Sequence, residues 1–166
     1  NKVVYENGIA YVCGEDGVLI ELLDNQWTLV DGNYYYVQNG EAITNRIVQI
    51  NGKYYGFSSN GSMYADTTFY NEDKKYYAKA DGSLYVNEWY SYYSWSKYYY
   101  GSDGKAYSGI QIVEGKQYYF DSEGSVCMNR VVATEDGKYY RCDEEGIATE
   151  LELANNDWTE INGKRY

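Results

Sequence analysis

The chain has 166 residues, a formal net charge of −11, no histidine and 24 tyrosines. Clustered Lys and Arg are missing, which argues against nucleic acid as a partner, and no run approaches 18 apolar residues, which argues against membrane insertion. The lack of histidine removes the commonest general base and metal ligand. An acidic, tyrosine-rich surface suits neutral sugars or a cationic ligand, although acidity also keeps an exposed β array soluble.

One short unit recurs along the whole chain, and residues 115–124 (GKQYYFDSEG) are a typical copy. The glycines that close the copies are 20 to 23 residues apart: Gly17, Gly40, Gly61, Gly82, Gly104, Gly124 and Gly146. A tyrosine stands six residues before each of them: Tyr11, Tyr34, Tyr55, Tyr76, Tyr98, Tyr118 and Tyr140. The chain is therefore a repeat protein, and its function must be argued from the repeat and its exceptions.

Each copy is predicted to form a β-hairpin followed by a second turn. Residues 3–5 and 9–13 flank Asn7-Gly8, and Asn-Gly or Asp-Gly between β-prone runs is the strongest short hairpin signal. The same kind of turn recurs at Asp31-Gly32, Asn51-Gly52, Glu114-Gly115, Asp136-Gly137 and Asn162-Gly163. The fourth copy replaces it by Asp73-Lys74.

Strand alternation predicts which residues of a copy face the neighbouring copies. The invariant tyrosine and the mostly aromatic residue two positions later are expected to face the stack. The residue between them varies and is expected to face solvent or a partner: Val12, Tyr35, Gly56, Tyr77, Tyr99, Tyr119 and Arg141. Since a lone hairpin is marginal in water, stacking is required, and we predict an all-β solenoid of stacked β-hairpin repeats.

The array is predicted to be a single domain over residues 1–166, with seven repeats and a partial eighth at 158–166. Tyr166 stands in the invariant slot of that last copy, and the closing glycine turn does not follow. We therefore expect a piece of a larger protein, or a last hairpin that acts as a cap.

The three cysteines are explained by the repeat rather than by redox chemistry. Cys13 and Cys142 stand in the slot four before the closing glycine, where four other copies have Tyr or Phe. Cys127 stands three after Gly124, a slot that holds Ile or Tyr in five other copies. Buried free thiols are expected, and neither a disulfide framework nor a zinc site.

The carboxylates beside the closing glycines have a structural explanation, because Asp in a turn accepts hydrogen bonds from the local backbone. They are Asp16, Asp81, Asp103, Asp121 and Asp143. No pair stands out from its repeat equivalents as a glycosidase pair would, and no dense ligand spacing indicates calcium. We predict no catalytic residue, no metal and no cofactor.

Residues 115–126 (GKQYYFDSEGSV) and 51–63 (NGKYYGFSSNGSM) resemble the cell-wall-binding repeat superfamily. This superfamily includes pneumococcal choline-binding repeats, glucan-binding repeats of streptococcal glucosyltransferases and receptor-binding repeats of clostridial toxins. The resemblance implies a left-handed solenoid of β-hairpins on a secreted or surface protein of a Gram-positive bacterium.

The ligand that the resemblance implies depends on the position directly before the Tyr-Tyr pair. Choline modules normally carry tryptophan there, and a quaternary ammonium needs several aromatic faces around it. In this chain the position holds Ala10, Asn33, Tyr54, Lys75, Lys97, Gln117 and Tyr139. The repeats are more similar to the glucan-binding and toxin subgroups, so a polysaccharide or cell-surface glycan is the favoured partner and choline the second.

The fifth copy departs most from the pattern, since residues 89–100 (WYSYYSWSKYYY) have lost the glycine turn and hold two tryptophans. Sugars stack their C–H faces on aromatic rings, so this stretch is the candidate carbohydrate-binding site. Its predicted residues, with one tyrosine from each flank to complete a groove, are Tyr85, Trp89, Tyr90, Tyr92, Tyr93, Trp95 and Tyr107. Alternatively, Trp89 fills the structural slot of Trp27 and Trp158, and the other rings cover the stack.

The predicted function is a non-catalytic carbohydrate-binding or cell-surface attachment module. Two alternatives stay open: a structural spacer or protein-interaction array, and a module that anchors to choline on teichoic acid.

Overall fold

The computed structural model describes residues 1–152, 160–161 and 164–165, and in these residues the chain forms β-strands and no helix. The predicted all-β class is thereby confirmed. Of the partial eighth copy, Trp158, Asn162-Gly163 and Tyr166 lie outside the described residues. The strands are β1 (Lys2–Glu6), β2 (Ile9–Cys13), β3 (Leu19–Glu21), β4 (Trp27–Val30), β5 (Asn33–Gln38), β6 (Glu41–Ala42), β7 (Arg46–Ile50), β8 (Lys53–Phe57), β9 (Thr67–Asn71), β10 (Lys74–Ala78), β11 (Glu88–Tyr93), β12 (Ser96–Tyr100), β13 (Gly109–Val113), β14 (Lys116–Phe120), β15 (Arg130–Ala133), β16 (Tyr139–Cys142), β17 (Ala148–Leu151), β18 (Glu160–Ile161) and β19 (Lys164–Arg165).

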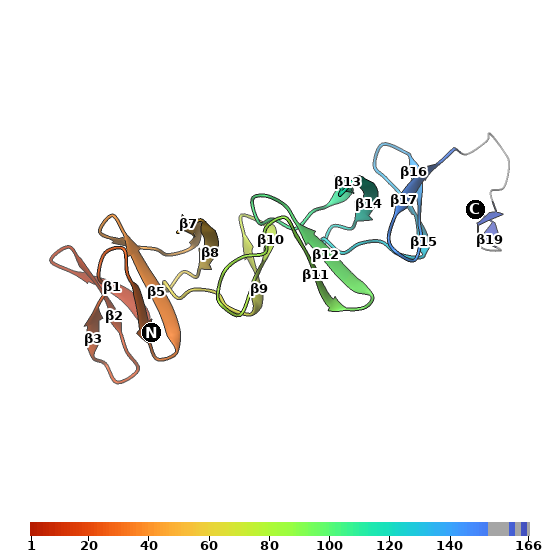
Figure 1. The fold of residues 1–166 in the computed structure, drawn as a ribbon. Coiled ribbons are helices and arrows are strands. Elements are labelled where there is room, and N and C mark those ends of the chain that lie inside the picture. The colour runs from red at the N-terminus through yellow and green to blue at the C-terminus, as the bar shows by residue number, and fades with distance from the viewer. Residues whose placement is uncertain (153–159, 162–163, 166) are drawn as a thin grey trace. The chain divides into compact units, whose positions relative to one another are not determined.

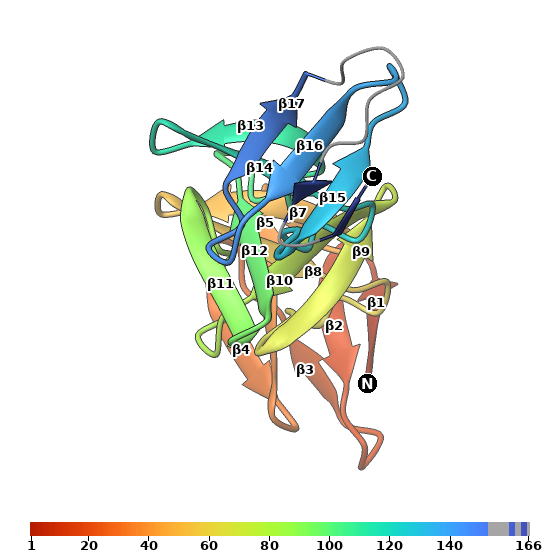
Figure 2. The same ribbon diagram turned by 90° about the vertical axis from the view of Figure 1, so that its right-hand side faces the viewer.

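The chain forms two compact units, each built from hairpins (Figures 1 and 2). The first unit contains residues 1–87 and 100–105, and the second contains residues 88–99 and 106–166. Successive strands pair antiparallel, as in β7 with β8 and β13 with β14, and a third short strand joins β1–β2, β4–β5 and β15–β16. No helix in the described part of the chain is long and apolar enough to cross a membrane.

The predicted hairpin turns form where glycine permits a left-handed backbone. Asn7 and Gly8 have φ values of 51° and 79°, as a two-residue type I′ turn requires. The expected position of the turn in the fourth copy was wrong by one residue. Glu72 and Asp73 carry positive φ values of 48° and 58°, and Lys74 already pairs with Asn71 in the ladder.

The turn that closes a copy is built the same way in six of the seven copies, whereas Gly40 stands in a two-residue turn between β5 and β6. The amide of Gly124 donates to the carbonyl of Asp121 at 3.0 Å, and the amide of Asp121 donates to Ser125 at 2.9 Å. The predicted role of the five aspartates is confirmed, since each side chain accepts a hydrogen bond from a backbone amide of its own turn. Asp121 accepts two, from Glu123 and Ser125. These carboxylates stabilise the turns.

Successive copies are joined by backbone hydrogen bonds as well as by packing. After three of the closing glycines, the amide two residues later donates to a carbonyl in the second strand of the preceding hairpin. Met63 donates to Tyr34 and Leu84 to Tyr54 in the first unit, and Val126 donates to Lys97 in the second, each at 2.8 Å. These bonds hold the residues after Gly61, Gly82 and Gly124 against β5, β8 and β12.

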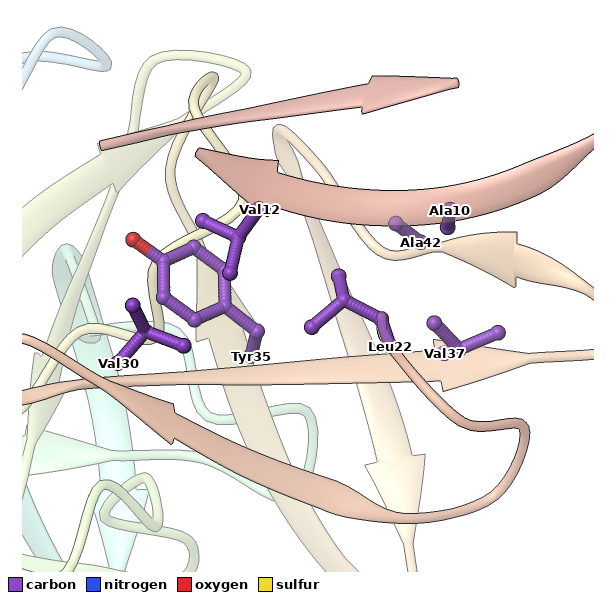
Figure 3. Packing of buried hydrophobic residues seen from close by; sticks show 7 residues of the cluster. All are labelled: Ala10, Val12, Leu22, Val30, Tyr35, Val37 and Ala42. Atoms are coloured by element: carbon purple, nitrogen blue, oxygen red, sulfur yellow. The ribbon is translucent and has the colours of Figure 1, made fainter. Parts of the chain in front are cut away.

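The face assignment is wrong for the first two copies. Val12 and Tyr35, expected to face solvent or a partner, are completely buried and lie in one apolar cluster with Leu22 and Val37 (Figure 3). The invariant Tyr34 is 44% exposed instead. Hairpin register does not explain this, since Val3 pairs with Val12 at the same distance from the closing glycine as Ile110 with Tyr119 in the sixth copy. In the first two copies the variable side chains share an apolar cluster with Leu22, which directly follows β3.

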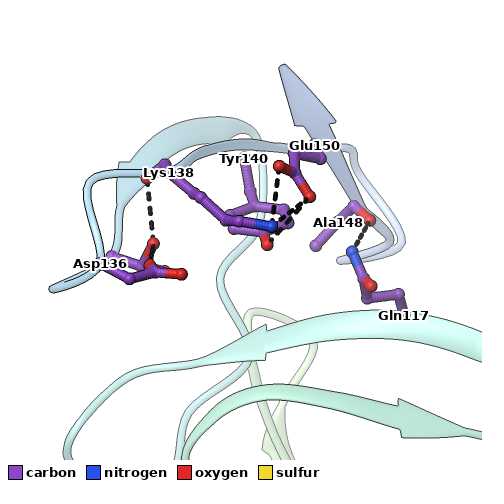
Figure 4. Close-up of polar contacts among 7 residues, drawn as sticks. Gln117, Asp136, Lys138, Tyr140, Ala148 and Glu150 are labelled. Carbon is purple, nitrogen blue, oxygen red and sulfur yellow. Dashed lines mark hydrogen bonds and ion pairs between the residues drawn. The ribbon is translucent and has the colours of Figure 1, made fainter. Parts of the chain in front are cut away.

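The assignment holds in the sixth copy, where Tyr118 and Phe120 are buried and Tyr119 is half-buried. The last three-stranded sheet is attached to this copy through Gln117, whose side-chain amide donates to the carbonyl of Ala148 at 3.1 Å (Figure 4). Within that sheet, Lys138 forms an ion pair with Glu150 at 3.0 Å. Both charged groups are about half exposed, so the ion pair contributes little to stability.

Candidate carbohydrate-binding site

The structure separates the predicted site residues into an exposed group and a packed group. Tyr92, Tyr93 and Trp95 are exposed by 63%, 51% and 69%, and they contact one another at the tip of the β11–β12 hairpin. Tyr93 stacks on Trp95 with centroids 4.9 Å apart and planes at 17°, and Tyr92 meets Tyr93 edge-on at 4.5 Å. We call these three residues the aromatic platform. Such solvent-facing, parallel rings can accept the apolar face of a sugar.

Trp89, Tyr90 and Tyr107 are not part of the platform, because all three are half-buried. Trp89 packs edge-on against Tyr99 and Tyr118 at 5.1 and 5.0 Å. Tyr107 packs against Tyr99 at 5.1 Å. The structural alternative for Trp89 is therefore supported by its packing.

The predicted groove between Tyr85 and Tyr107 remains a prediction. Tyr85 belongs to the first unit, where its ring lies 5.9 Å from that of Tyr100 and the ammonium of Lys79 lies 4.6 Å from its centroid. Tyr107 belongs to the second unit. Each ring is thus accounted for by packing within its own unit.

A cavity of about 420 Å³ lies beside the platform in the second unit. Trp95 and Ser94 of the hairpin turn line one part, and the residues that follow Gly124 line another. Polar side chains surround it: Asp121, Ser125, Asn129, Arg130 and Glu144. Aromatic surface beside several hydrogen-bonding groups is the combination that a carbohydrate site needs.

A second cavity, of about 500 Å³, lies in the first unit and was missed by sequence reasoning. Three rings line it, those of Trp27, Tyr34 and Tyr55, with Met63 and Asp81 beside them. The Trp27 ring lies 5.0 Å from Tyr55 and 6.3 Å from Tyr34, edge-on to both. Several aromatic faces around one space are the requirement for holding an organic cation. We call this the Trp27 cavity.

The carboxylate at the rim of the Trp27 cavity is anionic. The hydroxyl of Ser83 donates to Asp81 at 2.6 Å, the amide of Ser83 donates at 2.9 Å, and Lys53 lies 3.1 Å away. Chiefly because of the Ser83 hydroxyl, the pKa of Asp81 is lowered to about 2. Lys53 offsets part of the negative charge that a ligand in this cavity would meet.

The two cavities occupy corresponding positions in the repeat. Counted from the closing glycines, Met63 corresponds to Val126, Ala65 to Met128 and Ala80 to Glu144, and all six line a cavity. The second residue of the hairpin turn lines both as well. It is Gly32 in the first unit and Trp95 in the second. Loss of the glycine signal in the fifth copy thus places an indole at the rim of a recurrent cavity.

The tryptophans beneath the two cavities also have matching surroundings. Trp27 lies 5.0 Å from Tyr55 and 6.0 Å from Phe57, while Trp89 lies 5.0 Å from Tyr118 and 6.2 Å from Phe120. They differ in one respect: the ammonium of Lys97 lies 4.3 Å from the Trp89 centroid. Lys97 covers Trp89 where a ligand could contact Trp27, and Trp89 is absent from the cavity lining.

The remaining candidate ligands are acidic side chains and cysteines. In that part of the chain no three His, Cys, Asp or Glu side chains cluster in a way that could hold a metal ion. All three cysteines are unbonded there, with Cys127 and Cys142 buried and Cys13 half-buried.

The sequence of the chain is similar to streptococcal glucosyltransferases, and its structure is similar to a choline-binding protein. No protein-family model matches the chain. Glucosyltransferase-I of Streptococcus downei is 30% identical over 152 residues, which cover 83% of this chain and 9% of the relative. Glucosyltransferase-S of Streptococcus mutans is 29% identical over 147 residues, 86% of this chain and 10% of the relative. The chain thus spans about a tenth of the length of these curated relatives.

A solved structure covers a similar share of the chain. Choline binding protein F of Streptococcus pneumoniae, crystallised in the presence of a peptidoglycan analogue, has 25% identity and a TM-score of 0.65. The match covers 90% of this chain and 46% of that one. The chain is homologous to repeats of these glucosyltransferases and structurally similar to a choline-binding protein. Both similarities are consistent with the cell-wall-binding repeat superfamily.

Proposed function

We propose that the chain is a non-catalytic module that binds carbohydrate on a secreted or surface-attached protein of a Gram-positive bacterium. The observation that carries this function is the aromatic platform beside a cavity lined by polar side chains. Alignment with only 9–10% of the glucosyltransferases supports a binding rather than a catalytic role. The repeated hairpins are proposed to form one continuous β-solenoid array over residues 1–166.

Binding is proposed to start from the indole of Trp95. Stacking on Tyr93 fixes its orientation, so little rotamer freedom is lost when a sugar ring lies against it. Asn129 and Arg130 supply donors and Glu144 supplies an acceptor for hydroxyl groups at the edge of that ring. A single shallow site of this kind binds weakly, and repetition along a polysaccharide raises the overall affinity.

The test is a titration of the full chain with dextran and a panel of other polysaccharides, followed by tryptophan fluorescence and by affinity electrophoresis. Trp95→Ala is expected to lower the affinity at least about tenfold, the equivalent of about 1.4 kcal/mol. Thermal stability is expected to change by less than about 0.5 kcal/mol because the side chain is exposed. Ile112→Ala is the matched control, since Ile112 is a 70% exposed residue of the same unit outside the cavity lining. Unchanged binding by Trp95→Ala would refute the assignment of the platform.

A second candidate function is favoured by the Trp27 cavity, which supplies the aromatic wall that the sequence did not show before the Tyr-Tyr pairs. Three rings and the Asp81 carboxylate suit a quaternary ammonium such as choline. Retention on a choline resin that is lost in Trp27→Leu and kept in Trp95→Ala would establish this function. No response to choline or to any glycan would leave a structural spacer or protein-interaction array as the remaining function.

A further inference from the structure

Cys127 and Cys142 face each other at a contact that recurs in the repeat. The residue three after a closing glycine packs against the residue four before the next one. Tyr85 meets Tyr100 in this way with centroids 5.9 Å apart, and Tyr107 meets Phe120 at 5.8 Å. The corresponding residues after Gly124 are Cys127 and Cys142, which share one apolar cluster. In a chain with three cysteines, two occupy facing slots.

A cation lies next to the thiol pair. The Nε–H of Arg130 donates to the sulfur of Cys127 at 3.0 Å, and Arg130 is the cross-strand partner of Cys142 in the β15–β16 ladder. The neighbouring Cys142 thiol and the Arg130 guanidinium lower the pKa of Cys127 to about 6. The same neighbour and burial raise the pKa of Cys142. Cys127 is therefore the thiol of the pair that more readily becomes a thiolate.

We propose that Cys127 and Cys142 form a redox-active dithiol that closes to an intramolecular disulfide when the chain meets a low-molecular-weight disulfide. The two cysteines lie in one buried cluster, and Arg130, which donates a hydrogen bond to Cys127, pairs with Cys142 in the β15–β16 ladder. This inference is independent of the ligand that the module binds.

The reaction balances as two thiol–disulfide exchanges with glutathione disulfide. The Cys127 thiolate attacks one sulfur of glutathione disulfide, and glutathione thiolate leaves with the bonding electron pair. Cys142 loses its proton and attacks the Cys127 sulfur of the mixed disulfide, and the second glutathione thiolate leaves. The two cysteines are oxidised, one glutathione disulfide is reduced to two thiols, and the protons end on those thiols.

Arg130 is proposed as the positioning residue of this reaction, because its guanidinium favours the thiolate form of Cys127. Arg130 also lines the cavity beside Trp95. When Cys127 enters the disulfide, its sulfur loses its negative charge, and the guanidinium loses an anionic partner at the wall of that cavity.

The test is thiol counting by mass spectrometry on the full chain, incubated at pH 7.5 with glutathione disulfide, then denatured and alkylated. The number of alkylated cysteines is expected to fall from three to one, with Cys13 remaining, and the mass to fall by about 2 Da before alkylation. Trypsin should release residues 117–130 joined to the peptide that begins at Cys142. Cys13→Ser should react in the same way, and Cys142→Ser should stop at a mixed disulfide.

In a second experiment the chain is refolded from denaturant in a glutathione redox buffer, so that glutathione disulfide can react with both cysteines before they become buried. Three free thiols after both experiments, or a disulfide that includes Cys13, would overturn the proposal. Arg130→Gln should shift the pH profile of the reaction rate to higher pH, whereas a purely structural role for Arg130 would leave that profile in place.

Discussion

Removing the Lys97 ammonium, which covers Trp89, tests why Trp27 lines a cavity whereas the equivalent Trp89 does not. Lys97→Met keeps the length of the side chain and removes its charge. The ammonium lies 4.3 Å from the indole centroid, and Lys97 is half-buried. A cation over a tryptophan face is worth about 0.5–1 kcal/mol when exposed and about 2 when desolvated. An intermediate burial therefore predicts a loss of about 1 kcal/mol from the free energy of unfolding of the second unit.

The assay is a double-mutant cycle with Trp89→Leu, in which urea unfolding is followed by tyrosine fluorescence. The cycle isolates the Lys97–Trp89 interaction from the packing that each single change removes. Lys116→Met is the matched control, because its ammonium pairs at 3.7 Å with Glu145 on the surface and has no indole partner. Additivity of Lys97→Met and Trp89→Leu within about 0.3 kcal/mol would refute the contact. Because Lys97→Met uncovers the indole, it should also make Trp89 fluorescence sensitive to choline.

Three further predictions concern the first unit. The pKa of Asp81 is lowered from its ordinary value of 3.8 to about 2, so the stabilisation by its carboxylate should be complete above about pH 4 and be lost as the pH falls through about 2. Urea unfolding measured as a function of pH should show this dependence, and Asp81→Asn should remove it. Gly56→Ala should destabilise by about 1–3 kcal/mol, because a methyl group there would meet the ring of Phe69, and urea unfolding would measure the loss. Asp73→Gly should stabilise by about 1 kcal/mol because it relieves a left-handed residue, and a lower melting temperature would contradict this.

The recurrent turns could be predicted from the sequence because their signals are local. An Asp beside a closing glycine specifies one turn through hydrogen bonds to amides two to four residues away, as Asp121 and Asp143 show. Asn7-Gly8 specifies a hairpin through two φ values. The class of fold follows from such turns, since each requires only residues that are adjacent in the chain.

The face of each strand could not be predicted by averaging over copies. Val3 pairs with Val12 in the first copy and Thr68 pairs with Tyr77 in the fourth, so the two hairpins have the same register relative to their closing glycines. Burial nevertheless differs, because Val12 is completely buried whereas Tyr77 is only half-buried. Which face of a hairpin is covered depends on the elements that pack against it, and those elements differ from copy to copy.

The cavities could not be predicted from the repeat pattern either, because the lining residues of each cavity come from three successive copies. The Trp27 cavity takes its tryptophan from the second copy, Tyr55 and Met63 from the third, and Asp81 from the fourth. No copy contains a complete site, so a residue in the hairpin turn of one copy can determine which ligand binds between that copy and the next two. A glycine leaves the rim of the first cavity open at Gly32, and an indole extends the rim of the second at Trp95. Ligand recognition therefore depends on which copies are neighbours in the chain. A substitution that restores the common repeat residue in one copy should alter the site that this copy shares with the next two copies.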